Sequence, residues 1–330
     1  MLKKGLVVIP TQGLCNRLRF LACSSVFCNI NNIPLYIHWI PTKECNISID
    51  DFLITDKLNI VGINELINSK TIYYGRVHTN QIIDKINKVL VSENPEADYI
   101  IIEGGHEYRY PEMPITDFLY KKHLFYKSLR FTNQILDSVD DTISKIDIDN
   151  SIGIHYRDVA NVYDKNDIDV NKNLDFTNNS PLEKYIDIIE KTDCNNIIVI
   201  SNSKIFYDFI KNKFHNKKII STHPKYYDRD SKEGMICSVV DLLVLSKTNI
   251  ILGSYYSSFS DEATFFNYIP KIIPLGDDIL KKDKNSLLAY HCHGFSFDKI
   301  PIINNNDKIL QDIFRLNVNK LEELYTRNNL

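Results

Sequence analysis

Residues 196–221 read NIIVISNSKIFYDFIKNKFHNKKIIS. The runs Asn196–Ser201 and Lys218–Ser221 are rich in isoleucine and valine, which is typical of strands that are covered on both faces. Between them, Lys204–Lys213 has apolar residues at the spacing of one helix face. A strand, a helix and a second strand in so short a stretch predict a parallel strand pair joined by a crossover helix, the repeating unit of α/β proteins.

The same alternation continues along the rest of the 330 residues. Further β-branched runs predict strands at residues 5–9, 35–39, 99–102, 152–155, 249–253 and 271–274. Helical periods occur at residues 17–30, 133–146, 182–191, 235–246 and 317–327, and one more helix is expected to begin near Phe259. We therefore expect an α/β protein with parallel sheets.

A domain boundary is predicted near residue 150, where the polar stretch 147–150 precedes a fresh strand. Residues 1–150 and 151–330 would then form two Rossmann-like domains, with the ligand in the cleft at the carboxyl ends of the strands. The polar stretch 162–180 is expected to form a long surface loop, and the helix at 317–327 to pack back across the domains.

Composition excludes several classes of protein. The formal net charge is −3, which argues against a general nucleic-acid or polybasic membrane binder, so an anionic ligand needs a local site. None of the seven cysteines forms a CxxC pair, which argues against a zinc ribbon. No run approaches the roughly 20 apolar residues that span a bilayer. We expect a cytoplasmic protein without a transmembrane segment.

Residues 13–19, GLCNRLR, lie between the first strand and the first helix. Gly13 permits a tight turn, Asn16 is a good helix N-cap, and Arg17 and Arg19 add hydrogen-bond donors. A helix N-terminus of this kind suits an anion, although an ordinary capped junction with solvated arginines has the same sequence. The run lacks the glycines of a dinucleotide fingerprint and the lysine of a P-loop.

Residues 152–158, IGIHYRD, end a buried strand in His-x-Arg. The two-residue period of a strand points His155 and Arg157 the same way, and an arginine fork there suits a phosphate. A core histidine and an arginine paired with Asp158 would also explain the pattern.

Two later segments carry further polar groups. Asp241 interrupts an otherwise apolar helical stretch and needs a partner, which a ligand N–H group or a structural cap could supply. The run GSYYSSFSDE at 253–262 follows a strand and precedes a helix, which suits either an anion site or a plain serine-rich capping turn.

Taken in order, these segments resemble the fucosyltransferase-like superfamily of GT-B glycosyltransferases, which includes α1,2- and α1,6-fucosyltransferases, nodulation fucosyltransferases and protein O-fucosyltransferases. GLCNRLR is similar to the family's opening motif, IGIHYRD to its HxR peptide, and SVVDLLVLSKTNIILGSYYSSFSDEA to its third region. The resemblance covers nearly the whole chain and implies a GT-B fold with two Rossmann-like domains.

The resemblance also implies roles for individual residues. Arg157 would hold the β-phosphate of a nucleotide-sugar donor, most simply GDP-fucose, and stabilise the leaving diphosphate. His155 and Asp241 would contact guanine, Ser257 and Ser258 the diphosphate, and Asn202 belongs to the same donor set. On the acceptor side, Asn16, Arg17 and His106 would lie near the transferred sugar. HYRDVAN departs from the family pattern because it lacks a second basic residue after HxR.

The implied reaction is an inverting, metal-independent transfer of a sugar to a glycan hydroxyl, with no cofactor besides the donor. Asp158, Glu103 and His106 are the candidates for the base that the acceptor hydroxyl needs. The DxD triplets at 147–149, 167–169 and 228–230 lie in polar stretches and are not expected to bind metal. Two alternatives stay open: another donor, such as GDP-mannose, GDP-rhamnose or a UDP-sugar, and a non-catalytic nucleotide- or glycan-binding module. The sequence leaves the acceptor, the linkage and the oligomeric state open.

Overall fold

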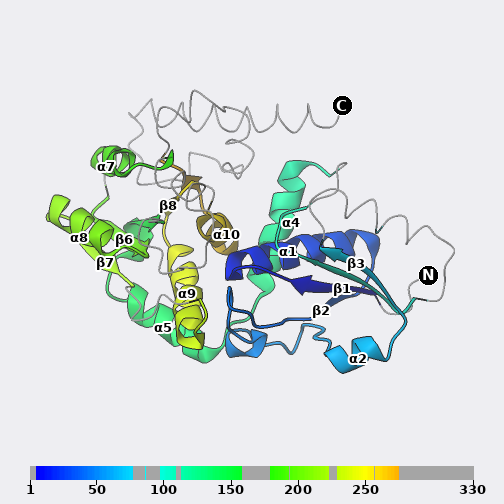
Figure 1. The fold of residues 1–330 in the computed structure, drawn as a ribbon. Coiled ribbons are helices and arrows are strands. Elements are labelled where there is room, and N and C mark those ends of the chain that lie inside the picture. The colour runs from blue at the N-terminus through cyan, green and yellow to red at the C-terminus, as the bar shows by residue number, and fades with distance from the viewer. Residues whose placement is uncertain are drawn as a thin grey trace. The chain divides into compact units, whose positions relative to one another are not determined.

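The computed structural model describes residues 5–76, 86, 97–108, 113–157, 179–192, 194–222, 229–255 and 257–274. The chain divides into two compact units. Unit 1 comprises Met1–Ile135 and Asp228–Ile236, and unit 2 comprises Leu136–Tyr227 and Cys237–Leu330. Each unit has its own parallel sheet with helices packed on it (Figure 1), which confirms the predicted α/β class. The assignment of 1–150 to the acceptor and 151–330 to the donor stays a prediction, as does a ligand cleft.

Unit 1 is built on a four-stranded sheet of order β2-β1-β4-β3. The strands are β1 (Gly5–Pro10), β2 (Leu35–Ile37), β3 (Thr71–Arg76) and β4 (Tyr99–Gly104), and all neighbours are parallel. The central strands β1 and β4 are almost entirely buried, which explains their continuous apolar runs. Their carboxyl ends lie side by side, because Pro10 is opposite Gly104.

The helices of unit 1 are α1 (Leu14–Asn31), α2 (Ile63–Ile67) and α4 (Ile115–Ser128), with a short 3-10 helix at Ile49–Asp51. Helix α1 packs on β1, β2 and α4, as Figure 1 shows, and it is buried around most of its circumference. It ends at Asn32 in the left-handed conformation, a common helix terminator.

Unit 2 has a five-stranded parallel sheet of order β7-β6-β5-β8-β9. Its strands are β5 (Ser151–Tyr156), β6 (Asn196–Ser201), β7 (Lys218–Ser221), β8 (Ile250–Leu252) and β9 (Lys271–Ile272). Its helices are the 3-10 helix Ile148–Asn150, α7 (Leu182–Lys191), α8 (Lys204–Lys213) and α10 (Ser258–Asn267). Two further helices, α5 (Asn133–Ile143) and α9 (Lys232–Leu245), begin in unit 1 and end in unit 2. Strand β5 is central, and its alternating side chains decide which groups face the core.

On one face of β5, Ile152, Ile154 and Tyr156 pack into the main core of unit 2. The Tyr156 ring stacks on Phe206 of α8 at a centroid distance of 4.0 Å. The opposite face presents His155, whose ring stacks on Phe259 of α10 at 4.9 Å. The alternation of the strand therefore sends the histidine away from the tyrosine cluster and toward the first turn of α10.

The predicted strands at 196–201 and 218–221 and the predicted helices at 182–191 and 204–213 have the observed bounds. The prediction that Asn16 caps the first helix is wrong. Gly13 is the N-cap and Asn16 lies in the first turn, because α1 begins at Leu14. The exposed strand β3 and the helix α4 were not predicted. Most of the loop at 162–180 and the helix at 317–327 lie outside the described residues.

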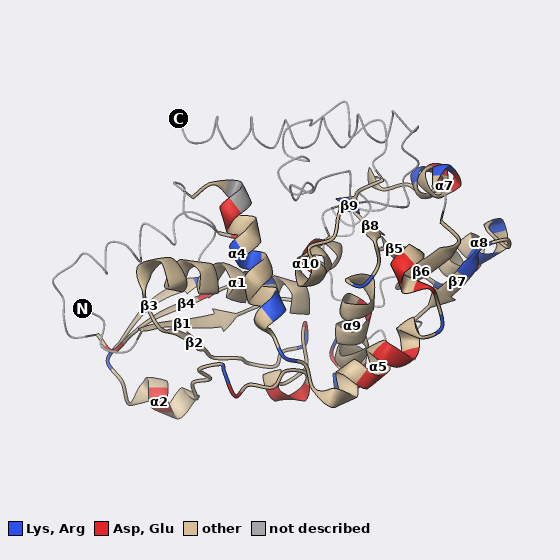
Figure 2. Ribbon diagram, turned by 180° about the vertical axis from the view of Figure 1, so that it is seen from behind, with Lys and Arg blue, Asp and Glu red and all other residues tan. Residues whose placement is uncertain are grey.

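Charged residues of both signs are interspersed along the helices (Figure 2), and α5 carries several acidic residues. No helix in the described part of the chain is long and apolar enough to cross a bilayer. Within the described ranges the cysteines are free, five of them buried and Cys237 partly exposed.

Candidate functional site

His155 is a buried polar residue of unit 2. It lies at the carboxyl end of β5, is 8% exposed, and its Nδ1 atom is buried with no hydrogen-bond partner among the described residues. Burial first, and the nearby positive charge of Arg157 second, lower the pKa of His155 to about 3. The ring is therefore neutral at physiological pH. A buried nitrogen left without a partner costs about 1–3 kcal/mol, which a ligand group could offset.

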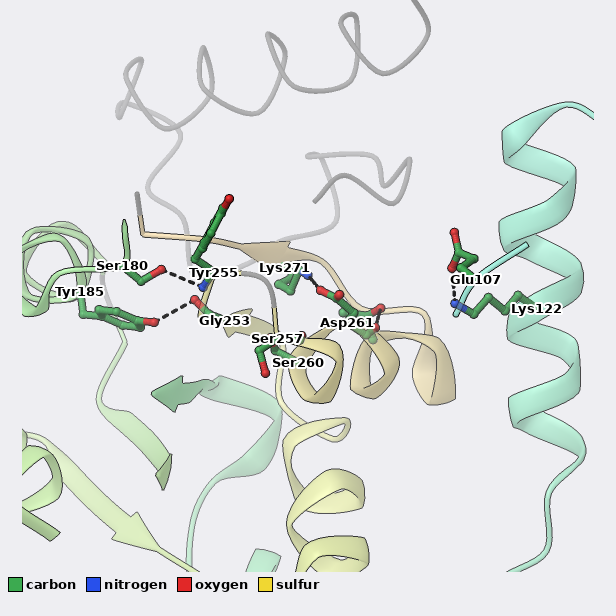
Figure 3. A network of polar contacts seen from close by, with 11 residues as sticks. Glu107, Lys122, Ser180, Tyr185, Gly253, Tyr255, Ser257, Ser260, Asp261 and Lys271 are labelled. Carbon is green, nitrogen blue, oxygen red and sulfur yellow. Dashed lines mark hydrogen bonds and ion pairs between the residues drawn. The ribbon is translucent and has the colours of Figure 1, made fainter. Parts of the chain in front are cut away.

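The backbone beside His155 is held by a group of buried hydroxyls. The Arg157 N–H donates to Ser254 Oγ at 2.8 Å, and Ser254 Oγ donates to the His155 carbonyl at 2.9 Å. Tyr185 of α7 donates its hydroxyl to the Gly253 carbonyl at 2.9 Å, as Figure 3 shows. These hydrogen bonds join the ends of β5 and β8, and they hold the backbone of Arg157 in place.

The turn after β8 leads into α10, whose N-terminus is a ready-made anion site. Ser257 is the N-cap, but its side chain makes no capping bond, and Ser258 begins the helix. A Cβ on Gly253 would lie 2.7 Å from Ser260 Oγ, so only glycine lets the end of β8 approach the first turn this closely. The backbone N–H groups of that turn are therefore presented beside the strand end.

A buried ion pair lies under the same turn. Lys271 on β9 contacts Asp261 of α10, and both side chains are almost completely buried (Figure 3). An unpaired buried charge is costly, so each of these residues requires the other. The pair anchors the first turns of α10 to the sheet edge.

Asp241 is on α9 and is 8% exposed. Burial raises the pKa of this carboxyl to about 7, and a hydrogen bond from Thr222, directly after β7, acts in the opposite direction. Asn202 follows β6, the strand between β7 and β5. The predicted donor residues therefore all lie at carboxyl ends of the unit 2 sheet or on α9 and α10. The contacts of the described residues link His155, Arg157 and the α10 turn, whereas Asp241 pairs with Thr222.

The predicted acceptor-side residues lie in unit 1. Glu103 on β4 accepts a hydrogen bond from the Tyr73 hydroxyl at 2.8 Å and has Arg76 at 3.9 Å. His106 is exposed in the loop after β4, with its Nε2 atom 3.5 Å from Gln12 Nε2. Asn16 is partly exposed on α1. Glu103 is thus near the carboxyl end of β4, and His106 lies in the loop that follows the same strand.

Arg17 lies in the interior of unit 1, and its predicted place near the transferred sugar stays a prediction. Its side chain is completely buried, and its nitrogens donate to Gln12 O, Ile40 O and Thr42 Oγ1 at 2.6–2.8 Å. These contacts join the loops after β1 and β2.

The sequence alone did not single out Tyr185, Thr222 and Gln12, which contact Gly253, Asp241 and His106. Thr222 had a usable signal, because it directly follows a predicted strand, whereas Tyr185 lies in an ordinary helix pattern. Asp158 lies outside the described residues. Residues 147–149 precede β5 at its amino end, the edge opposite His155, and no cluster of His, Cys, Asp or Glu in the described ranges is arranged to hold a metal.

No protein-family model and no protein of curated function matches the sequence. Solved structures do match. A NodZ alpha-1,6-fucosyltransferase soaked with GDP-fucose has a TM-score of 0.57 and 14% identity, over 82% of this chain and 95% of that one. An Arabidopsis thaliana FUT1 mutant in complex with GDP gives 0.53 and 13%, over 82% and 70%. POFUT1 in complex with GDP-fucose gives 0.51 and 12%, over 82% and 98%. At these identities the likeness establishes the fold, that of the GT-B fucosyltransferases, as the sequence motifs predicted.

Proposed function

We propose that the chain is a glycosyltransferase that transfers fucose from GDP-fucose to a hydroxyl group of a glycan. One observation carries the proposal: the neutral His155 has a buried ring nitrogen with no partner among the described residues, beside Arg157 and the N-terminus of α10. A nucleoside diphosphate brings both an anion and polar groups to such a place. NodZ and POFUT1, which share the fold, have been solved with GDP-fucose.

In this proposal the chemistry rests on charge. Displacement of the diphosphate by a hydroxyl inverts the configuration at the anomeric carbon of the sugar and leaves negative charge on the departing diphosphate. Arg157 and the N–H groups at Ser257 and Ser258 stabilise that charge more strongly in the transition state than in the ground state. Such donors can take the part that a divalent cation plays elsewhere, so we propose that transfer is metal-independent.

His155 and Asp241 recognise the guanine base of the nucleotide. The Asp241 carboxylate on α9 can accept hydrogen bonds from the N–H donors on one edge of guanine. Uracil does not present such donors in the same arrangement. Asn202 completes the donor set. The base that accepts the proton of the acceptor hydroxyl is one of Glu103, His106 and Asp158. A cytoplasmic location is part of the proposal.

The test is calorimetric titration with GDP, UDP and dTDP in EDTA, on wild type and on Arg157→Ala. We expect GDP to bind selectively and the substitution to weaken it about 10- to 150-fold, the value of one charged hydrogen bond of about 1.5–3 kcal/mol. Arg130→Ala is the matched control, because Arg130 is an exposed arginine of unit 1 paired with Asp56 at 2.6 Å. Its affinity should equal that of wild type.

Other results of the titration and of a GDP-release assay would favour one of the alternatives or refute the proposal. Selectivity for UDP or dTDP would keep the enzyme class and replace the donor. GDP binding without release of GDP from GDP-fucose would favour the non-catalytic binding module. A wild type that binds no nucleotide would refute the proposal, and strict dependence of GDP release on Mn²⁺ would refute its metal-independent form.

A further inference from the structure

Gln12 has a backbone conformation that nothing in the secondary structure requires. Its φ angle is +68°, and the only other non-glycine residues with positive φ in the described ranges are Asn32 and Tyr268. Those two cap the ends of α1 and α10, where a left-handed residue is common. Gln12 instead precedes a helix. A glycine would adopt this conformation without strain, so the presence of glutamine indicates that its side chain is needed.

Arg17 holds Gln12 in this conformation. Its Nε atom donates to the Gln12 carbonyl at 2.8 Å, while its terminal nitrogens donate to Ile40 O and Thr42 Oγ1. Its guanidinium carbon lies 5.0 Å from the centre of the Trp39 ring. Because Arg17 remains charged in a fully buried place, it needs all of these partners, and they fix the loop around Gln12.

The side chain of Gln12 is directed to the neighbouring loop. Its Nε2 atom lies 3.5 Å from Nε2 of His106, which follows β4. A Cβ on Gly105 would lie 2.8 Å from Thr11 O and 3.0 Å from Gln12 Oε1, so a larger residue there would displace the amide. The loops after two adjacent strands thus present an amide and an imidazole together.

We propose that Gln12 and His106 together bind a hydroxyl group of a sugar, and that Arg17 positions Gln12 for this contact. The inference rests on the proposed function and adds residues to it. A sugar hydroxyl donates one hydrogen bond and accepts two. The amide of Gln12 supplies both donors and an acceptor, and the ring nitrogens of His106 add further hydrogen-bonding groups, so the pair matches this chemistry. The sugar is either the transferred one or the acceptor.

The decisive variant is Gln12→Gly, which keeps the backbone conformation and removes the amide. Asn32→Gly is its matched control, because it relieves the same kind of conformation at the far end of α1. The melting temperature is measured for both variants and for wild type. Calorimetry gives their affinities for GDP and GDP-fucose. GDP release is then followed with water and with the methyl glycosides of galactose, glucose and N-acetylglucosamine as acceptors.

We expect Gln12→Gly to melt at or above the wild-type temperature and to bind GDP unchanged. If the hydroxyl belongs to the donor, its affinity for GDP-fucose falls about tenfold, as for the loss of one hydrogen bond. If it belongs to the acceptor, GDP-fucose binding is unchanged and the rate of GDP release falls by a similar factor. Asn32→Gly should match wild type in binding and rate.

Arg17→Lys tests the positioning role. It should lower the melting temperature and reproduce the functional loss of Gln12→Gly. The double variant should lose no more function than Gln12→Gly alone, because Arg17 acts through Gln12. Additive functional losses would refute that part.

The proposal is overturned if Gln12→Gly melts lower than wild type, which would make the side chain structural, or if its affinities and rates stay within twofold of wild type. A wild type that binds no GDP would instead refute the proposed function and take this inference with it. GDP titration of wild type separates the two failures.

Discussion

Asp241→Asn should make the protein more stable, by an amount that grows between about pH 4 and pH 7 and stays constant at higher pH. The Asp241 carboxyl is buried on α9, and burial raises its pKa from 3.8 to about 7. Between these values the folded state binds more protons than the unfolded state, so the wild type loses stability as pH rises through the window. Asparagine has nearly the same shape, can accept the hydrogen bond from Thr222, and cannot ionise.

The size of the stability difference follows from the shift in the pKa of Asp241. About three pKa units at 1.36 kcal/mol each give at most about 4 kcal/mol of lost stability above pH 7, and almost none near pH 4. The free energy of unfolding of Asp241→Asn should therefore equal that of wild type near pH 4 and exceed it by up to about 4 kcal/mol near pH 8. GDP affinity should fall in the variant, since a neutral amide is a weaker acceptor for guanine than a carboxylate.

Urea denaturation across this pH range, without nucleotide, measures the difference. Asp141→Asn is the matched control, because Asp141 is an exposed carboxylate on α5 paired with Lys145. Its effect should stay within about 0.5 kcal/mol at every pH. A difference between Asp241→Asn and wild type that does not change with pH, or a variant that is less stable near pH 8, would refute the assignment of burial as the dominant effect on this carboxyl.

Two further substitutions test the support of the α10 turn. Lys271→Met should destabilise the protein by about 3–5 kcal/mol, because it leaves Asp261 buried without a partner, and the double variant Lys271→Met/Asp261→Leu should recover most of the loss in urea denaturation. A double variant as unstable as the single one would contradict this. Tyr185→Phe should cost about 1–3 kcal/mol by leaving the Gly253 carbonyl unsatisfied, and calorimetry should also find weaker GDP binding; unchanged stability would show that the hydroxyl contributes little.

The places of the donor-side candidate residues in the fold were predictable, because each depends on a short stretch of sequence. A strand has a two-residue period, so HYR in a buried strand already separates His155 from Tyr156. The serine-rich run after β8 already indicated a helix N-terminus. Parallel strands place their carboxyl ends at one edge, so the position of each residue relative to its strand was enough to group them.

The contacts of Arg17 and Gln12 were not predictable from local sequence. Both lie in the first motif, and the sequence offered the arginine as the ligand contact. The structure buries Arg17 under Ile40 and Thr42, more than 20 residues away, and turns Gln12 toward His106. Hydrogen bonds between loops depend on which strands pair in the sheet, here β1 with β2 and with β4, and no local pattern encodes that pairing.

Periodicity and turn chemistry act over a few residues, so the order of amino acids was enough to predict the α/β class, most strand and helix positions in unit 2, and the polar residues at the strand ends. The tertiary structure alone decided which of these polar groups are buried, paired or left without a partner. Burial of His155 and Asp241, the ion pair of Lys271 with Asp261, and the hydrogen bonds of Arg17 all arise from contacts between distant segments, and it is burial that shifts the pKa values of His155 and Asp241.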